Sequence, residues 1–451
     1  MSFSQALSGL RSQGENIRVI SDNIANSQTV GFKSSRTAFA DIFAGCTGCG
    51  GQAGLGVRVV DIQQDFSAGA LENTGRGLDL AIAGRGFYRM EKSNGEIVYS
   101  RNGQFNQDAN GYLVNATGQF LTGFGLTDPN DPFSALAGGG APQRIQIPPD
   151  ALGANATTQA SAIYNLDSST IAGQDLQTAD LETAALGDPS DLQQVEFHYS
   201  TSFTTFDSLG NERTVTTYYE KTADNTWTAT VALDGRKTGW AAGDDPDFQL
   251  NFTADGELDV EVDGAGGPAI EDEGGVAGAP ADGSLAEGQV GLTFAVADYD
   301  LGGAEPLVFD LDLAGTTQFN SNSVQNNLTQ DGFAPGALIG IEVEDDGTVM
   351  RIFSNEERRA AGQIVLTNFI NPEGLSRDGD NAWRQTRASG EPNIGVAGTG
   401  VFGSIEGQTL EGSNVDLATE LVNMIISQRS YQANSTSIST QDELLQTIIN
   451  L

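Results

Sequence analysis

Apolar residues recur at alternating spacings of four and three along the first 25 residues of the chain. The positions between them are mostly Ser, Gln, Arg, Glu and Asn. This heptad-like rhythm predicts an amphipathic helix that ends near Asn26. The apolar positions of this N-terminal stripe are Phe3, Leu7, Leu10, Ile17 and Ile24.

The last 38 residues repeat the same spacing, and neither Gly nor Pro interrupts them. The stretch "SNVD" at residues 413–416 places an acid three positions after a hydroxyl residue, which resembles a capping box and predicts a helix start. We therefore expect a C-terminal helix that runs almost to the final residue. The apolar positions of its stripe are Leu417, Leu421, Met424, Tyr431, Ile438, Leu445 and Ile449.

The two predicted helices need a surface on which to bury their stripes. An isolated helix of this kind is only marginally stable in water, because most helix stability comes from burying the apolar face. One interpretation is an intramolecular coiled coil that ties the two ends of the chain together. The other is that both ends pack against further copies in an open, repeating assembly, since head-to-tail contacts that do not close produce filaments.

Between the two ends the pattern changes to short alternating runs separated by turn residues, which predicts β-strands. "GRGLDLAIAGRGFYRM" places Leu78, Leu80 and Ile82 on one face of a strand. A region near residues 195–233 alternates cleanly and is rich in Thr, Tyr, Val and Trp, which is strand composition. The expected turns are at Asn102-Gly103, Asn110-Gly111 and Asp346-Gly347.

These patterns together predict an α+β fold with nested parts. The N- and C-terminal helices form a coiled-coil-like terminal domain, followed outward by nested, mainly antiparallel β domains. The expected parts are a terminal helical assembly domain (1–26 with 414–451), a connector (27–74 with 400–413), a β domain (75–147 with 328–399) and an inserted outer β domain (148–327).

The formal net charge is −38, with 60 acidic and 22 basic residues, and no Lys or Arg occurs from Thr238 through Met350. Such a surface repels phosphate backbones, so we expect no nucleic-acid partner. The acidic stretch "GDDPDF" could supply calcium ligands from Asp244, Asp245 and Asp247. It lacks the carboxylate spacing and terminal Glu of an EF-hand loop, so we predict no metal site.

Candidate catalytic chemistry is sparse. The single histidine, His198, lies in an alternating run without a nucleophile elbow, and no phosphate-binding glycine loop is present. We predict no catalytic residues and no cofactor. Cys46 and Cys49 form a C-x-x-C pair in a glycine-rich loop, which we interpret as a local feature able to form a disulfide in an oxidising environment.

We also find no targeting signal in the sequence. No charged region followed by an apolar core opens the sequence, so we expect no cleavable signal peptide. No run of about 18 apolar residues occurs, so we expect no membrane insertion.

Both ends of the chain resemble the flagellar rod and hook axial proteins of bacteria. "ANSQTVGFK" follows the first predicted helix, as in that family, and "QRSYQAN" at residues 428–434 is similar to the core of the family's C-terminal helix. "FADIFAG", the large β insertion and "GQIVLTNFINPEGLSRDGDNAW" point within the family to the hook proteins. The junction motif that carries the resemblance is Asn26, Ser27, Thr29, Gly31, Phe32 and Lys33.

The resemblance implies a structural subunit and no enzyme. Hook subunits polymerise into a curved helical tube that acts as a flexible universal joint between motor and filament. Implied partners are other copies of the chain, rod proteins, the hook cap, hook–filament junction proteins and the export apparatus. The implied location is extracellular, in the flagellum, after export without a cleaved signal.

Two other functions stay open at this point. One is a distal rod subunit of the flagellar basal body, and the other is a secreted calcium-dependent β-domain adhesin. For Phe32 in the junction motif we consider two roles. It either anchors the junction against a neighbouring helix or subunit, or packs within its own chain as an ordinary loop aromatic.

Overall fold

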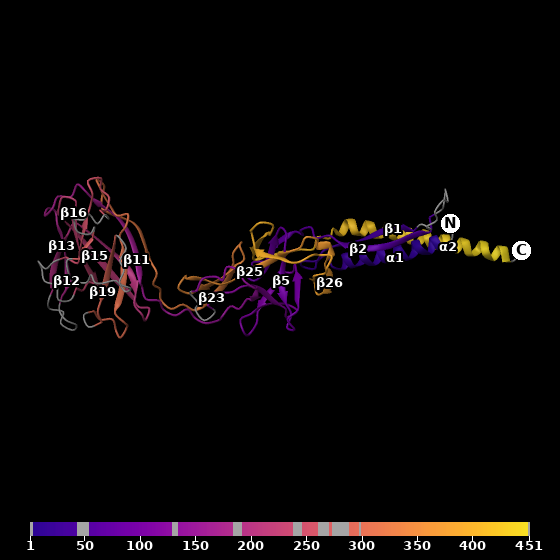
Figure 1. Cartoon of the computed structure of the whole chain (residues 1–451), viewed down its shortest axis with the longest axis horizontal. Coiled ribbons are helices and arrows are strands. Elements are labelled where there is room, and N and C mark those ends of the chain that lie inside the picture. Colours follow the sequence, from indigo (N-terminus) through magenta and orange to yellow (C-terminus); the bar gives the residue numbers. More distant parts are fainter. Residues whose placement is uncertain are drawn as a thin grey trace. The chain divides into compact units, whose positions relative to one another are not determined.

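The computed structural model describes residues 3–42, 54–128, 134–183, 192–237, 246–259, 270–272, 288–296 and 299–449. They form two compact units (Figure 1). Unit 1 consists of Met1–Asp150, Leu338–Ile352 and Arg358–Leu451, and unit 2 consists of Ala151–Ala337 and Phe353–Glu357. The described chain is mostly β, with one long helix near each end, so the predicted α+β class is confirmed. The finer four-part division given above remains a prediction.

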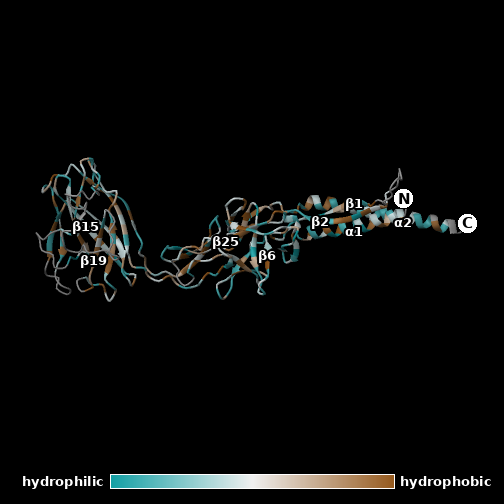
Figure 2. Ribbon diagram, viewed as in Figure 1, coloured by the Kyte–Doolittle hydropathy of each residue, from teal (hydrophilic) through white to brown (hydrophobic). Residues whose placement is uncertain are grey.

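Unit 1 begins and ends with helices that lie antiparallel beside each other. Helix α1 (Phe3–Ala25) ends where the sequence predicted. Helix α2 (Leu417–Ile449) starts after Asp416, whose carboxylate accepts hydrogen bonds from the backbone N–H groups of Ala418 and Thr419. The capping-box interpretation of residues 413–416 is therefore wrong, because Asp416 caps the helix N-terminus itself. Figure 2 shows apolar and polar residues interleaved along both helices.

A two-stranded hairpin packs along α1. Its strands, β1 (Ser35–Ile42) and β2 (Gly56–Gln64), pair antiparallel with a bulge between Ala38 and Phe39. Both strands contact α1, so this helix has two neighbours, α2 and the hairpin.

The rest of unit 1 is built around a twelve-stranded sheet. Its main path runs β23 (Leu338–Val343), β24 (Thr348–Phe353), β25 (Arg358–Asn368), β9 (Phe120–Phe124), β5 (Phe87–Glu91), β6 (Ile97–Ser100), β27 (Ala382–Arg384) and β26 (Ser376–Gly379). The remaining strands are β7 (Phe105–Gln107), β8 (Leu113–Asn115), β10 (Gln143–Arg144) and β28 (Asn393–Val396), and a short 3-10 helix, η1, spans Pro372–Gly374. Two small pairs join segments from opposite ends of the sequence: β4 (Leu80–Ala83) with β29 (Ser404–Gly407), and β3 (Leu71–Asn73) with β30 (Thr409–Glu411).

The predicted turns have mixed outcomes. Gly111 and Gly347 have positive φ angles and close turns, as predicted. Asn102-Gly103 is not a turn. A Cβ on Gly103 would lie 1.6 Å from the carbonyl oxygen of Leu80, so glycine there permits a close backbone approach. Leu80 and Ile82 are fully buried in the unit 1 core, as their place on a strand face suggested.

Unit 2 consists of two five-stranded sheets and a hairpin. One sheet contains β11 (Gln159–Asp167), β19 (Gln289–Phe294), β20 (Leu307–Asp312), β21 (Thr317–Phe319) and β22 (Val324–Gln330). The other contains β14 (Tyr199–Phe206), β15 (Glu212–Ala223), β16 (Thr226–Leu233), β17 (Phe248–Asn251) and β18 (Ile270–Asp272), and the hairpin pairs β12 (Gln177–Glu182) with β13 (Leu192–Phe197). Alternating inward residues of both sheets form one core that includes Tyr164, Tyr219, Trp227, Phe294 and Phe309.

Candidate assembly surface

The junction motif after α1 is held by a buried ionic cluster. The Lys33 ammonium lies 2.6 Å from one carboxylate oxygen of Glu411, and the Arg101 guanidinium lies 3.0 Å from the other. The side chains of Lys33 and Glu411 are fully buried, and that of Arg101 is 4% exposed. Lys33 also donates to the Ser67 carbonyl and Arg101 to the Gly84 carbonyl. The cluster joins three segments of the chain. Lys33 follows α1, Arg101 follows β6, and Glu411 ends β30, the last strand before α2.

The electrostatics of this cluster depend on its burial. Burial lowers the pKa of Lys33, and the neighbouring Glu411 carboxylate opposes that shift. For Glu411, burial raises the pKa, but the charges of Arg101 and Lys33 and the hydrogen bonds outweigh it, so the pKa lies below its usual value. Two buried cations share one carboxylate, so Glu411 fixes the geometry of the junction, because removing its charge leaves Lys33 and Arg101 buried without a counter-charge.

The glycine and the phenylalanine of the motif have distinct places. Gly31 has φ 69°, and a Cβ there would lie 2.6 Å from the backbone of Arg101, so only glycine fits. Phe32 is buried within its own chain, under the guanidinium of Arg377, whose Cζ lies 5.9 Å from the ring centroid. This placement corresponds to the second of the two roles considered for Phe32.

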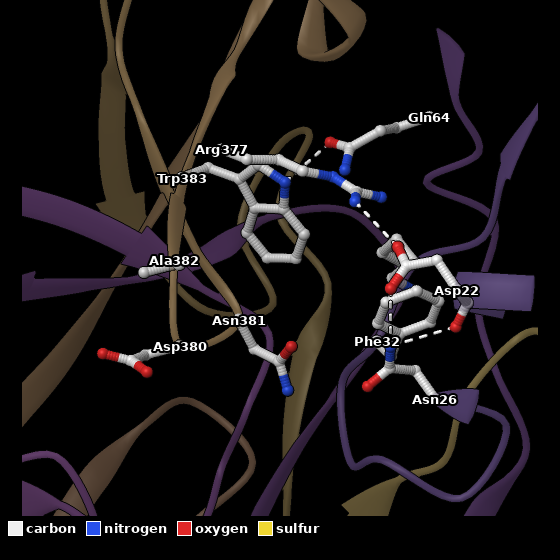
Figure 3. Close-up of a pocket in the computed structure, with 11 residues that line it drawn as sticks. Asp22, Asn26, Phe32, Gln64, Arg377, Asp380, Asn381, Ala382 and Trp383 are labelled. Carbon is white, nitrogen blue, oxygen red and sulfur yellow. Dashed lines mark hydrogen bonds and ion pairs between the residues drawn. The ribbon is translucent and has the colours of Figure 1, made fainter. Parts of the chain in front are cut away.

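A cavity of about 190 Å³ lies beside Phe32 (Figure 3). Arg377 reaches from β26 across its mouth to the carboxylate of Asp22 at 3.2 Å. Trp383 forms another wall and donates to Gln64 at 2.7 Å, while Asn381 donates to the Val30 carbonyl at 3.1 Å. The β26–β27 hairpin of the large sheet therefore contacts the junction through an ion pair and hydrogen bonds.

The other junction residues form the turn itself. Asn26 donates to the Asp22 carbonyl at the end of α1, and Thr29 donates to the Asn26 side chain at 3.1 Å. The Ser27 N–H bonds to the Ile24 carbonyl. The Asn26 side chain thereby offers the backbone an alternative to further helical turns, which favours the end of the helix there.

Polar and small residues mediate the contact between α1 and α2. Asn16 donates to Ser427 at 2.8 Å, and Asn23 donates to Glu420 at 3.3 Å. The Asn434 side chain lies against Gly9, where a Cβ would be 2.9 Å from it. We call these three contacts the polar ladder; its rungs are Gly9/Asn434, Asn16/Ser427 and Asn23/Glu420, seven residues apart on each helix. Asn23 also exchanges two hydrogen bonds with the backbone of Ser35.

The hairpin contacts a second polar face of α1. Ser8 accepts a hydrogen bond from the Val57 N–H, and Ser12 donates to the Val57 carbonyl, both at 3.2 Å. Ala6, Val19 and Ile20 supply the buried apolar contacts of the helix.

The hydrogen bonds between the two helices therefore come from residues outside the predicted stripes. In α1, Leu7, Leu10, Ile17 and Ile24 are half-buried, as are Met424 and Ile438 in α2. Exposed apolar residues of the predicted stripe in α2 are Leu417, Leu421, Tyr431 and Leu445. The side chains of Phe3 and Ile449, and the Cys46 and Cys49 pair, lie outside the described residues. The predicted coiled coil through these stripes is not confirmed, because the hairpin and the polar ladder make the hydrogen bonds of α1.

Comparison with known proteins places these surfaces in a family. The model "Flagella basal body rod protein" matches residues 4–33, and "Flagellar basal body rod FlgEFG protein C-terminal" matches 406–451. "Flagellar hook protein FlgE/F/G D1 domain" matches residues 81–161, and "Flagellar basal body protein FlaE D2 domain" matches 165–333.

Full-length relatives narrow the family further. The chain is 41% identical over 456 residues to a protein of Escherichia coli named flagellar hook protein FlgE, with all of both chains covered. The chain belongs to the flagellar hook protein family. Proteins of the same name from Salmonella typhimurium (39% over 454 residues, all of both chains) and Borreliella burgdorferi (29% over 470 residues, 100% of this chain and 99% of the other) are also similar.

Within this hook-family chain, the residues considered for chemistry have structural roles. His198 accepts from the Lys221 N–H at Nδ1 and contacts the Gln174 carbonyl at Nε2. Asp247 is buried and pairs with Lys237 at 2.7 Å, while Asp244 and Asp245 lie outside the described residues. The described residues contain no group of three or more His, Cys, Asp or Glu side chains placed to hold a metal ion. None of the helices in that part of the chain is long and apolar enough to span a membrane.

The apolar periodicity of the sequence did not indicate several residues that build the terminal part of unit 1. The seven-residue spacing of Gly9, Asn16 and Asn23 was visible and could have indicated a polar contact face. Glu411 and Arg101 gave no such signal, because a lone charged residue beside a strand is usually solvated. The residues not predicted are Gly9, Asn16, Asn23, Arg101, Arg377, Glu411, Glu420, Ser427 and Asn434.

Proposed function

We propose that this chain is the structural subunit of a flagellar hook, which polymerises into a curved helical tube and transmits motor torque as a flexible universal joint. The observation that carries the proposal is the unpartnered apolar surface of the terminal helices. Leu421, Val422, Ile425 and Ile426 are each between 46% and 57% exposed on α2. A family of hook proteins whose members match the whole chain supports the same function.

The helix pair is suited to assembly because polar side chains contribute to its internal contacts and leave apolar side chains of α2 exposed. The polar ladder contributes hydrogen bonds to the pairing of α1 and α2, while several aliphatic side chains of α2 stay exposed. Fully burying an exposed aliphatic side chain contributes about 1.5–3 kcal/mol, and these side chains have about half of that burial left to gain, so several such contacts per copy favour polymerisation. The terminal helices would form the inner layer of the tube, and the β units would lie outside it.

The acidic second unit fits the outer position in this proposal. Most of the acidic excess of the chain lies in residues 151–337. Highly charged, polar surfaces associate weakly, so they can slide past one another while the tube bends. The proposed partners are further copies, rod proteins, the hook cap, hook–filament junction proteins and the export apparatus, and the proposed location is the extracellular flagellum.

A deletion experiment tests the proposal. Chains lacking residues 1–25 or 414–451 are expected to remain monomeric, while the full chain forms tubes visible by negative-stain electron microscopy. Tubes formed by either truncated chain would contradict the role of the terminal helices. Straight rods formed by the full chain would point instead to a rod subunit.

A further inference from the structure

Another cavity of unit 1 adjoins the buried ionic cluster, because Arg101 belongs to both. Its volume is about 330 Å³, at the lower end of the roughly 300–1,000 Å³ typical of ligand sites. Phe66, Phe87 and Phe369 supply aromatic walls. The rings pack edge to face, with centroids 5.4 Å apart for Phe66 and Phe87 and 6.1 Å apart for Phe87 and Phe369. Arg85 also lines the space, which we call the arginine cavity.

The buried charges next to the arginine cavity do not balance. Lys33 and Arg101 carry two positive charges, and Glu411 supplies one negative charge between them. Asp65 also attracts Lys33, but it is exposed, so water weakens its effect. The Cζ of Arg101 lies 5.5 Å from the ring centroid of Phe87, which offsets part of the excess. The remaining positive charge has almost no access to water, so an anion beside it is favoured.

Both arginines of the cavity have donors to offer an anion. The Nε–H of Arg101 is buried and has no hydrogen-bond partner among the described residues. Arg85 is exposed, and its guanidinium forms no ion pair within the part of the chain that the structure describes. Buried donors are almost always satisfied, so the unused Nε–H indicates a place for an acceptor. The planar guanidinium group matches the geometry of a carboxylate.

Ile370 adds an apolar surface to the same cavity. This side chain is 92% exposed although it lines the cavity. An occupant that enters the cavity also covers part of Ile370 and contacts the phenylalanine walls, and burial of this apolar area favours binding. The arginines therefore select a negative charge, and the surfaces around them select an apolar body.

We propose that the arginine cavity binds a carboxylate carried on an aromatic or branched aliphatic body. The carboxylate supplies the missing negative charge to Arg101 and pairs with Arg85, while the body packs against the phenylalanine walls and Ile370. A free organic acid has this chemistry, and so does an acidic residue beside an apolar one in a protein segment. The site belongs to the monomer, so its test is separate from that of the proposed function.

Titration of the monomeric full chain with phenylacetate tests the site. The chain contains three tryptophans, and the ring of Trp383 lies 5.5 Å from that of Phe66 and 5.6 Å from that of Phe87. In protein labelled with fluorotryptophan, the fluorine NMR signal of Trp383 therefore reports on the cavity wall, and Trp383→Phe assigns it. We expect a saturable shift of this signal and none of the other two. No shift at about 10 mM phenylacetate, where even a millimolar site is mostly occupied, would overturn the proposal.

Matched compounds and variants separate charge from shape. Phenylacetamide keeps the shape without the charge, and we expect it to bind about tenfold more weakly than phenylacetate. Arg85→Gln should weaken phenylacetate binding by about the same factor, with unchanged thermal unfolding. Arg58→Gln is the control, because Arg58 is exposed beside a different apolar groove, along α1, and should leave the affinity unchanged. Equal affinities for the acid and its amide, or for Arg85→Gln and the unsubstituted chain, would contradict a carboxylate site.

Two peptides distinguish the sources of the carboxylate. N-acetyl-Phe-Glu-amide presents the acid as a side chain, and N-acetyl-Phe-Gln-amide is its uncharged counterpart. If the acidic peptide shifts the Trp383 signal at lower concentration than phenylacetate does, the carboxylate comes from a protein segment. The opposite order assigns the cavity to a free organic acid, and either order supports the proposal. An equal shift with inorganic phosphate would show an unselective anion site and overturn it.

Discussion

The core of unit 2 and the terminal helix pair of unit 1 distribute apolar residues in opposite ways. In unit 2, Trp227, Tyr219 and Phe309 are fully buried by their own chain. In the helix pair the buried positions include Ser12, Asn23 and Ser427, while Ile425 and Ile426 are more than half exposed. The first region buries its large apolar side chains within the monomer. The second leaves several aliphatic side chains of α2 exposed, which is the expected pattern in a subunit that folds first and assembles later.

The two regions also differ in how their buried charges are arranged. Unit 1 joins its chain ends through the Lys33, Arg101 and Glu411 cluster, which has almost no access to water. Unit 2 has the smaller Lys237–Asp247 pair. The buried charges therefore fix the junction in the monomer. In the helices next to it, several apolar side chains of α2 remain exposed.

The largest effect is expected from neutralising the centre of the ionic cluster. Glu411→Gln leaves Lys33 and Arg101 buried without a counter-charge, and should destabilise unit 1 by about 3–5 kcal/mol. Scanning calorimetry of the full chain measures the effect on the transition of unit 1. Glu212→Gln, at an exposed strand position, is the control and should change little. A loss below about 1 kcal/mol in Glu411→Gln would show that the cluster does not hold the junction.

Truncating one large apolar residue in each region contrasts them directly. Phe309→Ala opens a cavity in a sealed core and should cost about 3–5 kcal/mol of unit 2 stability. Ile425→Ala removes an exposed side chain and should change monomer stability by no more than about 0.5 kcal/mol. Chemical denaturation of the monomers measures both. Equal losses would mean that α2 buries Ile425 within the monomer.

Asn23 connects α1 to both of its neighbours and gives a smaller effect. Asn23→Ala removes its hydrogen bond to Glu420 and leaves the N–H and C=O of Ser35 without their side-chain partner. The expected loss is about 1–3 kcal/mol, because a buried donor and a buried acceptor lose their bonds. The exposed Asn322→Ala is the control. Hydrogen exchange at the start of β1 should speed up in Asn23→Ala only; unchanged exchange there would contradict this role.

Mild acid should produce the smallest change. The pKa of Glu411 is lowered in the folded chain, so its contribution to stability is complete above the ordinary carboxyl pKa of about 4.3. As the pH falls below that value, the unfolded chain takes up a proton before the folded one, and the contribution is lost. The unit 1 unfolding temperature, followed from pH 6 to pH 3, should fall less steeply in Glu411→Gln. Identical slopes would exclude Glu411 as a source of acid sensitivity.

Local patterns predicted much of the fold. The heptad spacing predicted both terminal helices, and α1 ends one residue before Asn26. Period-two alternation predicted strands in the middle, because side chains alternate across a sheet. The Asp346-Gly347 turn was also predictable, since Gly347 has a positive φ angle that glycine adopts without strain.

Contacts between distant segments could not be predicted in this way. Gly103 looks like a turn residue after Asn102, but it is required where the Leu80 carbonyl passes close by. Lys33 looks like a solvated charge, but it is buried because Glu411, 378 positions away, lies beside it. In both cases a residue far away in the sequence decides the role of the nearby one.

The sequence by itself determined which segments are helical, which are extended and which family the termini resemble, because these depend on periodicity and on local turn chemistry. Only the tertiary structure decided which face of each helix is used. α1 has two neighbours in its own chain, and both make hydrogen bonds with polar residues of the helix, while the apolar residues of the predicted stripe are only half-buried. Leu7 and Leu10 therefore face an open groove, and Leu421 and Ile425 of α2 stay exposed. Amphipathicity indicates that an apolar face will be covered, but the partner that covers it is set by packing.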